Sequence, residues 1–340
     1  MAIMKHESMR KNHRIYVAGH SGLVGSALRR ELERNGYGNL LLRTHAQLDL
    51  RDRAAVWRFF DEHGPEYVFL AAAKVGGILA NDKYPADFLR DNIEIQTNVI
   101  DSAFRSGVKR LLFLGSTCIY PKDCPQPIKE EYLLSGPLEP TNRAYALAKI
   151  AGIEMCWSYN RQYGTQYLAA MPTNVYGPGD NFDLETSHML PALIRKAIEA
   201  NAVGARTVTV WGTGTPRREL LYSDDLAEAC VHLMQLSEAD FRKVLRPDEP
   251  PLINVGTGED LSIREIAELV CRVVGFEGDM QFDPSRPDGT PRKLCDVSRI
   301  RALGWRAHTS LEQGIRRTLD SAKVAAWQST LSPLHPGLAG

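Results

Sequence analysis

The sequence predicts an α/β fold built on a doubly wound parallel sheet, joined to a smaller mixed α/β domain. From residue 14 onward, short apolar runs alternate with segments whose apolar residues recur at helical spacing. Single helical segments separate successive strands, which is typical of parallel pairing through right-handed crossovers. After residue 182 this rhythm loosens and turn residues become frequent. A chain of 340 residues is also longer than one typical domain, so we expect two cores.

The first half of the chain supplies most of the sheet. Its predicted strands are 14–19, 39–44, 66–73, 110–116 and 166–177. Between them we expect helices over 22–36, 53–64, about 86–106 and about 144–163. In the second half, helices are predicted at 188–200, 224–236 and 262–275, and strands at 207–212 and 252–258.

These elements divide the chain into two domains. We predict a larger domain from residues 14–176 with 207–258, and a smaller one from 177–206 with 259–325. Segment 285–305 of the smaller domain is basic and rich in turn residues. Residues 1–13 and 326–340 are predicted to be tails.

Composition excludes several classes of protein. The chain has 44% hydrophobic and 24% charged residues, and its 41 basic residues balance 41 acidic ones. This balance argues against binding to bulk nucleic acid or to an anionic membrane, and no apolar run is long enough to span a bilayer. The six cysteines form no C-x-x-C pair, so we expect no metal site and reduced thiols in the cytoplasm. The first residues lack the apolar stretch of a signal peptide.

A glycine-rich turn follows the first predicted strand. Gly19 permits a tight turn, Gly22 lets a pyrophosphate approach the backbone, and Gly25 lets the helix pack closely on the sheet. The free N–H groups at the start of that helix then bind the anion. Such glycine triplets recur by chance, but the flanking strand and helix favour a dinucleotide site over a plain turn.

The end of the second predicted strand indicates which dinucleotide binds. An acidic residue there would hold a ribose 2′-hydroxyl, whereas an arginine accommodates a 2′-phosphate. Arg43 stands at this position, which favours NADP(H). The alternative is that Arg43 is simply a solvated charge at a strand end.

A second motif places Tyr145 and Lys149 four residues apart on one face of a predicted helix. An ammonium beside a phenol favours the phenolate, so we expect the pKa of Tyr145 to lie below its ordinary value of ~10. Tyr145 could then protonate a carbonyl oxygen as hydride arrives, while Ser116 holds the same oxygen. The tyrosine–lysine pair alone is a weak signal, but the glycine turn and Ser116 make it specific.

These motifs resemble the extended short-chain dehydrogenase/reductase family over nearly the whole chain. Within that family the chain is similar to the NADPH-dependent epimerase-reductases that act on GDP-4-keto-6-deoxy-D-mannose. The match is carried by ordered stretches that include "AGHSGLVGSA", "LAAAKVGGI", "LGSTCIYPK", "EPTNRAYALAKIAG", "MPTNVYGPGDNF", "SHMLPALIRK", "VWGTGTPRREL" and "RPDGTPRKL". The resemblance implies an NADP-binding Rossmann domain, a smaller nucleotide-sugar domain and a homodimer formed through a helix bundle.

The resemblance also implies roles for individual residues. It assigns Ser116, Tyr145 and Lys149 as the reductase triad, with Cys118 and His188 as a second acid/base pair. The implied cofactor-binding residues are Gly19, Ser21, Gly22, Leu23, Val24, Gly25, Arg43, Ala71, Ala72, Ala73, Lys149, Pro172 and Asn174. The implied substrate-binding residues are Asn174, His188, Lys196, Trp211, Arg218, Asp288 and Arg292. Lys196 stands where some members of the family carry arginine, which would replace a fork-shaped contact by a point charge.

A thiol beside the catalytic serine is unexpected in a simple ketone reductase. In a 4-keto sugar the C–H bonds at C3 and C5 are acidic, and the enolate formed there places its charge on O4. Cysteine and histidine have ordinary pKa values of ~8.5 and ~6.5, so a Cys118/His188 pair can exchange protons near neutrality. Taken singly, Cys118 would be core filler and His188 an ordinary hydrogen-bonded histidine. Their joint match to one family favours the catalytic interpretation.

The same stretch argues against several relatives. Sugar 4,6-dehydratases of this superfamily typically carry an Asp-Glu pair where this chain has Cys118 and Ile119. A 4-epimerase would share the triad but not require the thiol, and a GDP-mannose 3,5-epimerase would carry lysine in place of His188. Two alternatives stay open: an enzyme of this type that acts on another nucleotide 4-keto-6-deoxy sugar, and a non-enzymatic NADP-binding redox sensor. The intact triad argues against the sensor.

Overall fold

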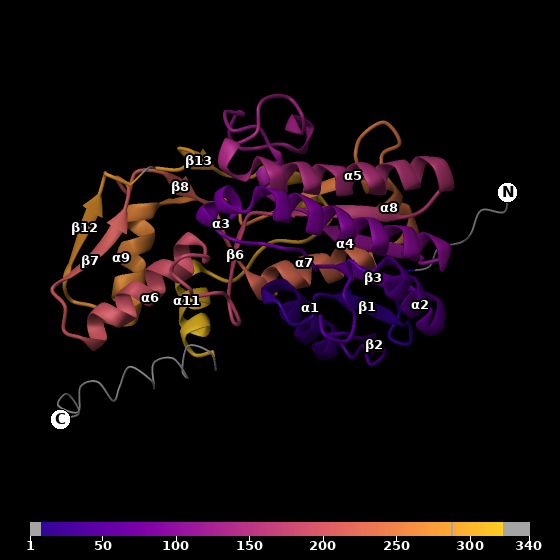
Figure 1. The fold of residues 1–340 in the computed structure, drawn as a ribbon, viewed down its shortest axis with the longest axis horizontal. Coiled ribbons are helices and arrows are strands. Elements are labelled where there is room, and N and C mark those ends of the chain that lie inside the picture. Colours follow the sequence, from indigo (N-terminus) through magenta and orange to yellow (C-terminus); the bar gives the residue numbers. More distant parts are fainter. Residues whose placement is uncertain (1–7, 287, 322–340) are drawn as a thin grey trace.

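The computed structural model describes residues 8–286 and 288–321. It contains one large sheet and a separate small lobe, which lies at the left of Figure 1. The residues called tails at 1–7 and 326–340 lie outside the described part. Within 8–13 the prediction of a loose tail is wrong, because Met9 and His13 are buried and the His13 ring stacks on Tyr67 at 5.0 Å.

The large sheet has six parallel strands in the order β10-β5-β4-β3-β1-β2. All except β2 are buried along their whole length and are mainly apolar, as expected for a parallel sheet covered on both faces. Its strands are β1 (Ile15–Ala18), β2 (Leu40–Leu41), β3 (Tyr67–Leu70), β4 (Arg110–Leu114), β5 (Tyr167–Pro172) and β10 (Leu252–Val255). The doubly wound parallel sheet predicted from the sequence is thus confirmed.

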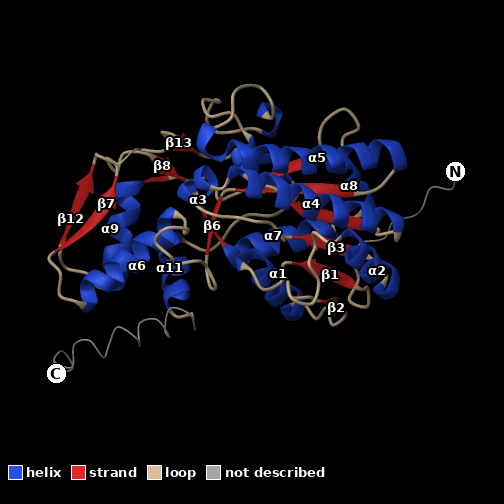
Figure 2. Cartoon of the chain, in the orientation of Figure 1, coloured by secondary structure: helices blue, strands red, loops and turns tan. Residues whose placement is uncertain are grey.

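Helices cover both faces of this sheet (Figure 2). One face packs against α1 (Leu23–Arg34) and α7 (Ser223–Gln235). The other packs against α2 (Arg53–His63), α4 (Pro85–Arg105) and α5 (Arg143–Tyr163). Shorter helices complete the domain: α3 (Ile78–Lys83), η1 (Thr117–Ile119), η2 (Glu130–Tyr132), η3 (Pro140–Asn142), α8 (Glu238–Val244) and α10 (Ser298–Ala302).

The strand order locates the expected binding edge. After β1 the chain goes to β2 on one side, and after β2 it returns to β3 on the other side. Ligands of open α/β sheets bind at such a switch point, beyond the carboxyl ends of the strands. The glycine turn that follows β1 and the serine that follows β4 both lie at this edge.

The small lobe has its own apolar core, formed around α6 (Met189–Ala202), α9 (Ile263–Val274) and α11 (Leu311–Leu319). Strand β7 (Thr207–Trp211) pairs in parallel with β12 (Asp279–Asp283), and β8 (Arg217–Arg218) pairs with β11 (Leu261–Ser262) and β13 (Arg292–Lys293). A parallel pair, β6 (Asn174–Tyr176) with β9 (Leu220–Tyr222), joins the lobe to the large domain. Strands β7 and β8 therefore lie in the small lobe and not in the large domain predicted for 207–258, whereas α10, from the segment predicted for the small domain, packs in the core of the large one through Ile300.

Candidate active site

The glycine turn after β1 fits a bound pyrophosphate. Gly19 has a φ of +85°, and a Cβ there would stand 2.8 Å from the backbone of Ala72, which follows β3. A Cβ on Gly25 would overlap the carbonyl oxygen of Gly19, so any side chain would push α1 off the turn. At Gly22 the protein leaves room for a Cβ, and no side chain caps the helix that begins after it. The first N–H groups of α1 are therefore free to receive an anion.

Arg43, at the end of β2, is anchored rather than freely solvated. Its guanidinium donates to the Leu42 carbonyl oxygen at 2.8 Å and lies 2.8 Å from Nε2 of His63 on α2. It also lies over the Phe59 ring, with 5.3 Å from its central carbon to the ring centroid. These contacts hold a cation beside the glycine turn, where His20 lies close enough to hydrogen-bond the Arg43 backbone.

The structure brings the predicted triad together below the carboxyl end of β4. Ser116 follows β4 and its hydroxyl accepts from the Cys118 N–H at 3.2 Å. Tyr145, on α5, lies close enough to the Ser116 hydroxyl for the two groups to interact. One helical turn further on, Lys149 is buried and its Nζ donates to the Leu114 carbonyl oxygen at 2.7 Å.

The proton affinities of the triad differ from the prediction. Burial, reinforced by the nearby Cys118, raises the pKa of Tyr145 above its ordinary value, and only the Ser116 contact opposes this. The expected lowering by Lys149 is wrong here, since its Nζ lies 5.8 Å from the Tyr145 ring centroid and is directed to a backbone carbonyl. Burial lowers the pKa of Lys149 to about 7. Tyr145 is thus a protonated donor at neutral pH, whereas Lys149, one helical turn further on, can gain or lose its proton at that pH.

Cys118 is not core filler. It lies in η1, its side chain is half-buried, and Nδ2 of Asn142 donates to its Sγ at 3.3 Å. Lys293, in β13 of the small lobe, places its Nζ 3.9 Å from the same sulfur. Two donors from different elements therefore converge on one thiol next to the triad, as a site that uses the sulfur as a proton acceptor would require. The sequence did not predict that Asn142 and Lys293 contact Cys118, although both residues stand in motifs that resemble the family, "PTNRAY" and "PRK".

His188 begins the small lobe's first helix. It is the N-cap residue of α6, and its side chain is exposed to solvent. The neighbouring protein atoms partly desolvate the imidazole, which lowers its pKa. The segment before it contacts the turn after β3, because Gly77 N–H donates to the Thr186 carbonyl oxygen at 2.9 Å. The turn continues into α3, which packs against the η3 segment that holds Asn142. The two domains are thus connected around the site.

The predicted substrate residues of the small lobe form two groups. In the first, two cations lie against the half-exposed Trp211 ring, with Lys196 Nζ at 4.8 Å and the Arg286 guanidinium at 4.9 Å from the ring centroid. Partial burial, and then Arg286, lower the pKa of Lys196. Arg286 was not predicted; its position in the basic turn "SRPDG" was the available signal.

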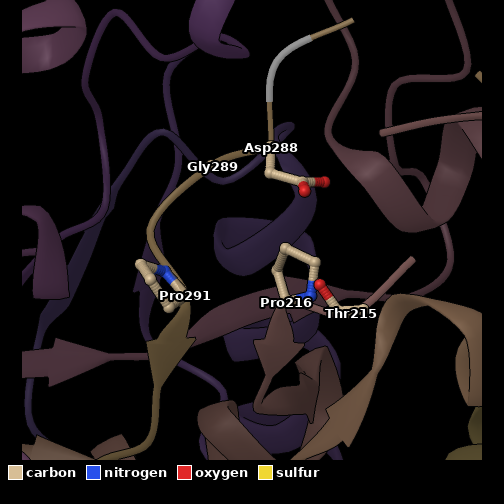
Figure 3. Close-up of a pocket in the computed structure, with 5 residues that line it drawn as sticks. All are labelled: Thr215, Pro216, Asp288, Gly289 and Pro291. Carbon is tan, nitrogen blue, oxygen red and sulfur yellow. The ribbon is translucent and has the colours of Figure 1, made fainter. Parts of the chain in front are cut away.

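The second group lies around a pocket of ≈130 Å³, which only Asp288 among the predicted residues lines (Figure 3). Its lining includes Asp288, which accepts hydrogen bonds from the Thr213 N–H and hydroxyl at 2.9 and 2.7 Å. Arg218 lies behind this loop and donates to the Thr290 carbonyl oxygen at 2.6 Å. Arg292 instead forms an ion pair with Asp260, so its neighbour Lys293 is the residue of this strand that reaches Cys118.

Two further predicted residues lie where the chain passes from β5 to β6, between the large domain and the small lobe. Pro172 is the last residue of β5, and Asn174, the first of β6, donates to the Glu219 carbonyl oxygen at 3.0 Å.

Among residues 8–286 and 288–321, no cluster of three His, Cys, Asp or Glu side chains could hold a metal ion. Over the same residues, no helix has the length and apolar character needed to cross a bilayer.

A protein-family model described as the NAD dependent epimerase/dehydratase family matches residues 15–247. The chain belongs to this family. It is 55% identical to GDP-L-fucose synthase 1 of Arabidopsis thaliana over 310 residues, which cover 91% of this chain and 93% of that protein.

Solved structures of similar proteins share the fold of this epimerase/dehydratase family member. A GDP-6-OMe-4-keto-L-xylo-heptose reductase from C. jejuni superimposes with a TM-score of 0.86 at 39% identity, covering 95% of this chain and 99% of that chain. A GDP-L-fucose synthetase from Naegleria fowleri bound to NADP superimposes with a TM-score of 0.83 at 29% identity, covering 93% and 94%.

Proposed function

We propose that this chain is a GDP-L-fucose synthase, an NADPH-dependent enzyme that epimerises GDP-4-keto-6-deoxy-D-mannose at C3 and C5 and then reduces its C4 ketone. The observation that carries the proposal is the Cys118 thiol, which lies beside the Ser116–Tyr145 pair and accepts from Asn142. A reductase alone needs the pair but not the thiol. The 55% identity to a GDP-L-fucose synthase supports the same substrate.

The Ser116 and Tyr145 hydroxyls form one site for the sugar's O4. Because the pKa of Tyr145 is raised, its phenol stays protonated at neutral pH and donates a hydrogen bond to that oxygen. Removal of a proton from C3 or C5 forms an enolate whose charge is on O4, where the same hydroxyls stabilise it. The proton passes to one member of the Cys118/His188 pair, and the other returns a proton to the opposite face of that carbon.

Reduction uses the same oxygen site. NADPH, when bound, supplies a hydride for C4. Tyr145 transfers its proton to O4 as the alkoxide forms, which completes the hydroxyl. Lys149, with a pKa of about 7, can then share a proton with the phenolate that remains. The free N–H groups of α1 and the Arg43 cation would hold the cofactor's pyrophosphate and 2′-phosphate.

The small lobe would hold the GDP group. A half-exposed indole with two cations beside it, as at Trp211, suits a nucleobase or sugar face with a diphosphate next to it. Asp288 lines the neighbouring pocket, and Arg218, behind the same loop, would supply a further polar contact. The positive charges that would bind the diphosphate are therefore confined to this site, in agreement with the chain's overall neutrality.

Two further parts of the proposal concern the protein's assembly and location. We expect a homodimer formed through the paired helices α4 and α5, where Leu89 and Leu147 are exposed at 39% and 37%. Light scattering coupled to size exclusion would give the mass directly.

All six cysteines are free thiols, which supports a reducing compartment such as the cytoplasm.

The product's stereochemistry tests the activity. The purified enzyme is incubated with GDP-4-keto-6-deoxy-D-mannose and NADPH, and the product sugar is assigned by proton NMR couplings. We expect GDP-L-fucose. A 6-deoxy sugar that keeps the original configuration at C3 and C5 would show a simple reductase, the activity named for the C. jejuni relative.

A further inference from the structure

The cation expected to bind the cofactor's 2′-phosphate is held by a histidine and not by a carboxylate. Two groups accept from the Arg43 guanidinium, the Leu42 carbonyl oxygen and Nε2 of His63, each at 2.8 Å. In the described part of the chain, no carboxylate lies within ion-pair distance of Arg43. A guanidinium has five N–H donors, so donors remain for a ligand.

The hydrogen bonds of His63 define its state. It is the last residue of α2, and its Nδ1 lies 3.1 Å from the Phe59 carbonyl oxygen one turn earlier. Because a carbonyl can only accept, Nδ1 carries the hydrogen and donates. Nε2 faces a guanidinium, which can only donate, so Nε2 carries no hydrogen. The imidazole is therefore neutral in this arrangement.

The surrounding ring contacts fix His63 and Arg43 together. The His63 ring stacks on the Phe59 ring with 4.7 Å between centroids and 27° between planes. The guanidinium lies over the same Phe59 ring. The Phe59 ring thus orients both His63 and Arg43. The half-buried His63 is coupled to Arg43 directly by the hydrogen bond and indirectly through this shared ring.

We propose that His63 is a positioning residue that sets the enzyme's preference for a cofactor with a 2′-phosphate. A neutral acceptor fixes the direction of the Arg43 side chain without cancelling its charge, whereas a carboxylate would fix the direction and neutralise the cation. Arg43 therefore faces a phosphate as an oriented, uncompensated cation. This inference rests on the proposed use of NADPH.

Calorimetric binding to the intact protein separates orientation from charge. The two probes are adenosine 2′,5′-bisphosphate and adenosine 5′-monophosphate, and the readout is the ratio of their dissociation constants. His63→Leu removes the acceptor, His63→Gln keeps a neutral acceptor, and His63→Glu keeps an acceptor but adds a negative charge. Asp61→Leu, two residues away on the opposite side of α2, is the matched control.

The wild type and Asp61→Leu should prefer the bisphosphate to the same extent, and His63→Gln should keep most of that preference. His63→Leu should reduce it by about fivefold, the value of one ordinary hydrogen bond, and leave the monophosphate within about twofold. His63→Glu should reduce it further, by about tenfold or more, because an added carboxylate competes with the phosphate.

Three outcomes would contradict different claims. If His63→Leu and His63→Glu keep the wild-type ratio, His63 does not position Arg43 and the inference fails while NADP use stands. Equal weakening of both probes would assign His63 a merely structural role. If the wild type itself does not prefer the bisphosphate, the proposed NADP preference is wrong whatever His63 does.

Discussion

Replacing Lys149 by methionine should change how the protein's stability depends on pH. Burial lowers the pKa of Lys149 from 10.5 to about 7, and the side chain is only 3% exposed. The difference between these values corresponds to about 5 kcal/mol of cost for the charged form in the folded state. Methionine has a similar length and carries no proton, so Lys149→Met removes that cost.

The direction follows from proton binding. Between about pH 7 and 10.5 the unfolded chain keeps the Lys149 proton and the folded chain does not, so the wild type's free energy of unfolding rises with pH there. Below about pH 7 both states are protonated and the contribution is constant. The wild type should therefore gain about 2 kcal/mol relative to Lys149→Met between about pH 6 and about pH 8.5.

Urea unfolding of the cofactor-free protein at these two pH values measures the effect. The free-energy difference between wild type and variant is compared across pH, so that titrations common to both proteins cancel. Lys129→Met, which removes an exposed charge, is the matched control. A difference for Lys149→Met that stays constant within about 0.5 kcal/mol would refute a proton affinity set by burial.

Three substitutions test other parts of the site. Tyr145→Phe should lower the rate of C4 reduction by at least about 100-fold while the dissociation constant of NADP⁺ stays unchanged, because only the proton donor is lost; a small rate effect would contradict that role. Gly25→Ala should weaken NADP⁺ binding, measured by fluorescence quenching, by at least about tenfold, because its Cβ overlaps a backbone carbonyl; Gly38→Ala, which meets no atom within 4 Å, should bind normally. Trp211→Ala should raise the dissociation constant of GDP by about tenfold, since stacking on a base is worth ~1–3 kcal/mol; unchanged calorimetry would show that the nucleotide lies elsewhere.

The strands of the large sheet and the main helices of the small lobe could be predicted from the sequence, whereas the strand pairing of the small lobe could not. Runs such as "IYVA" and "YVFL" are apolar throughout, and a strand buried on both faces requires that pattern. The run "TVTVW" of β7 alternates instead, and its threonines and tryptophan are exposed. That alternation predicts a strand with one open face, which does not fit the large domain predicted to contain 207–258. The partner of β7, strand β12, is a polar run "DMQFD" without a strong strand signal.

Contacts between distant residues limited the prediction of the site. Ser116, Tyr145 and Lys149 were found because each follows a strand or shares a helix face. Lys293 reaches Cys118 from 175 residues away, through a two-residue strand of the other lobe. Nothing local to "PRK" distinguishes Lys293, which faces the thiol, from Arg292, which pairs with Asp260. The raised pKa of Tyr145 likewise depends on burial, which helical spacing does not report.

Hydrogen exchange at the sugar tests the central claim that one oxygen site serves two reactions. Wild type and Cys118→Ser are each incubated with GDP-4-keto-6-deoxy-D-mannose and NADPH in deuterated water, and NMR measures label at C3 and C5. The wild-type product should carry deuterium at both carbons. Cys118→Ser should lose label by at least about 100-fold while it still oxidises NADPH with a keto sugar. An unlabelled wild-type product, or a variant that labels both carbons at the wild-type rate, would contradict the account.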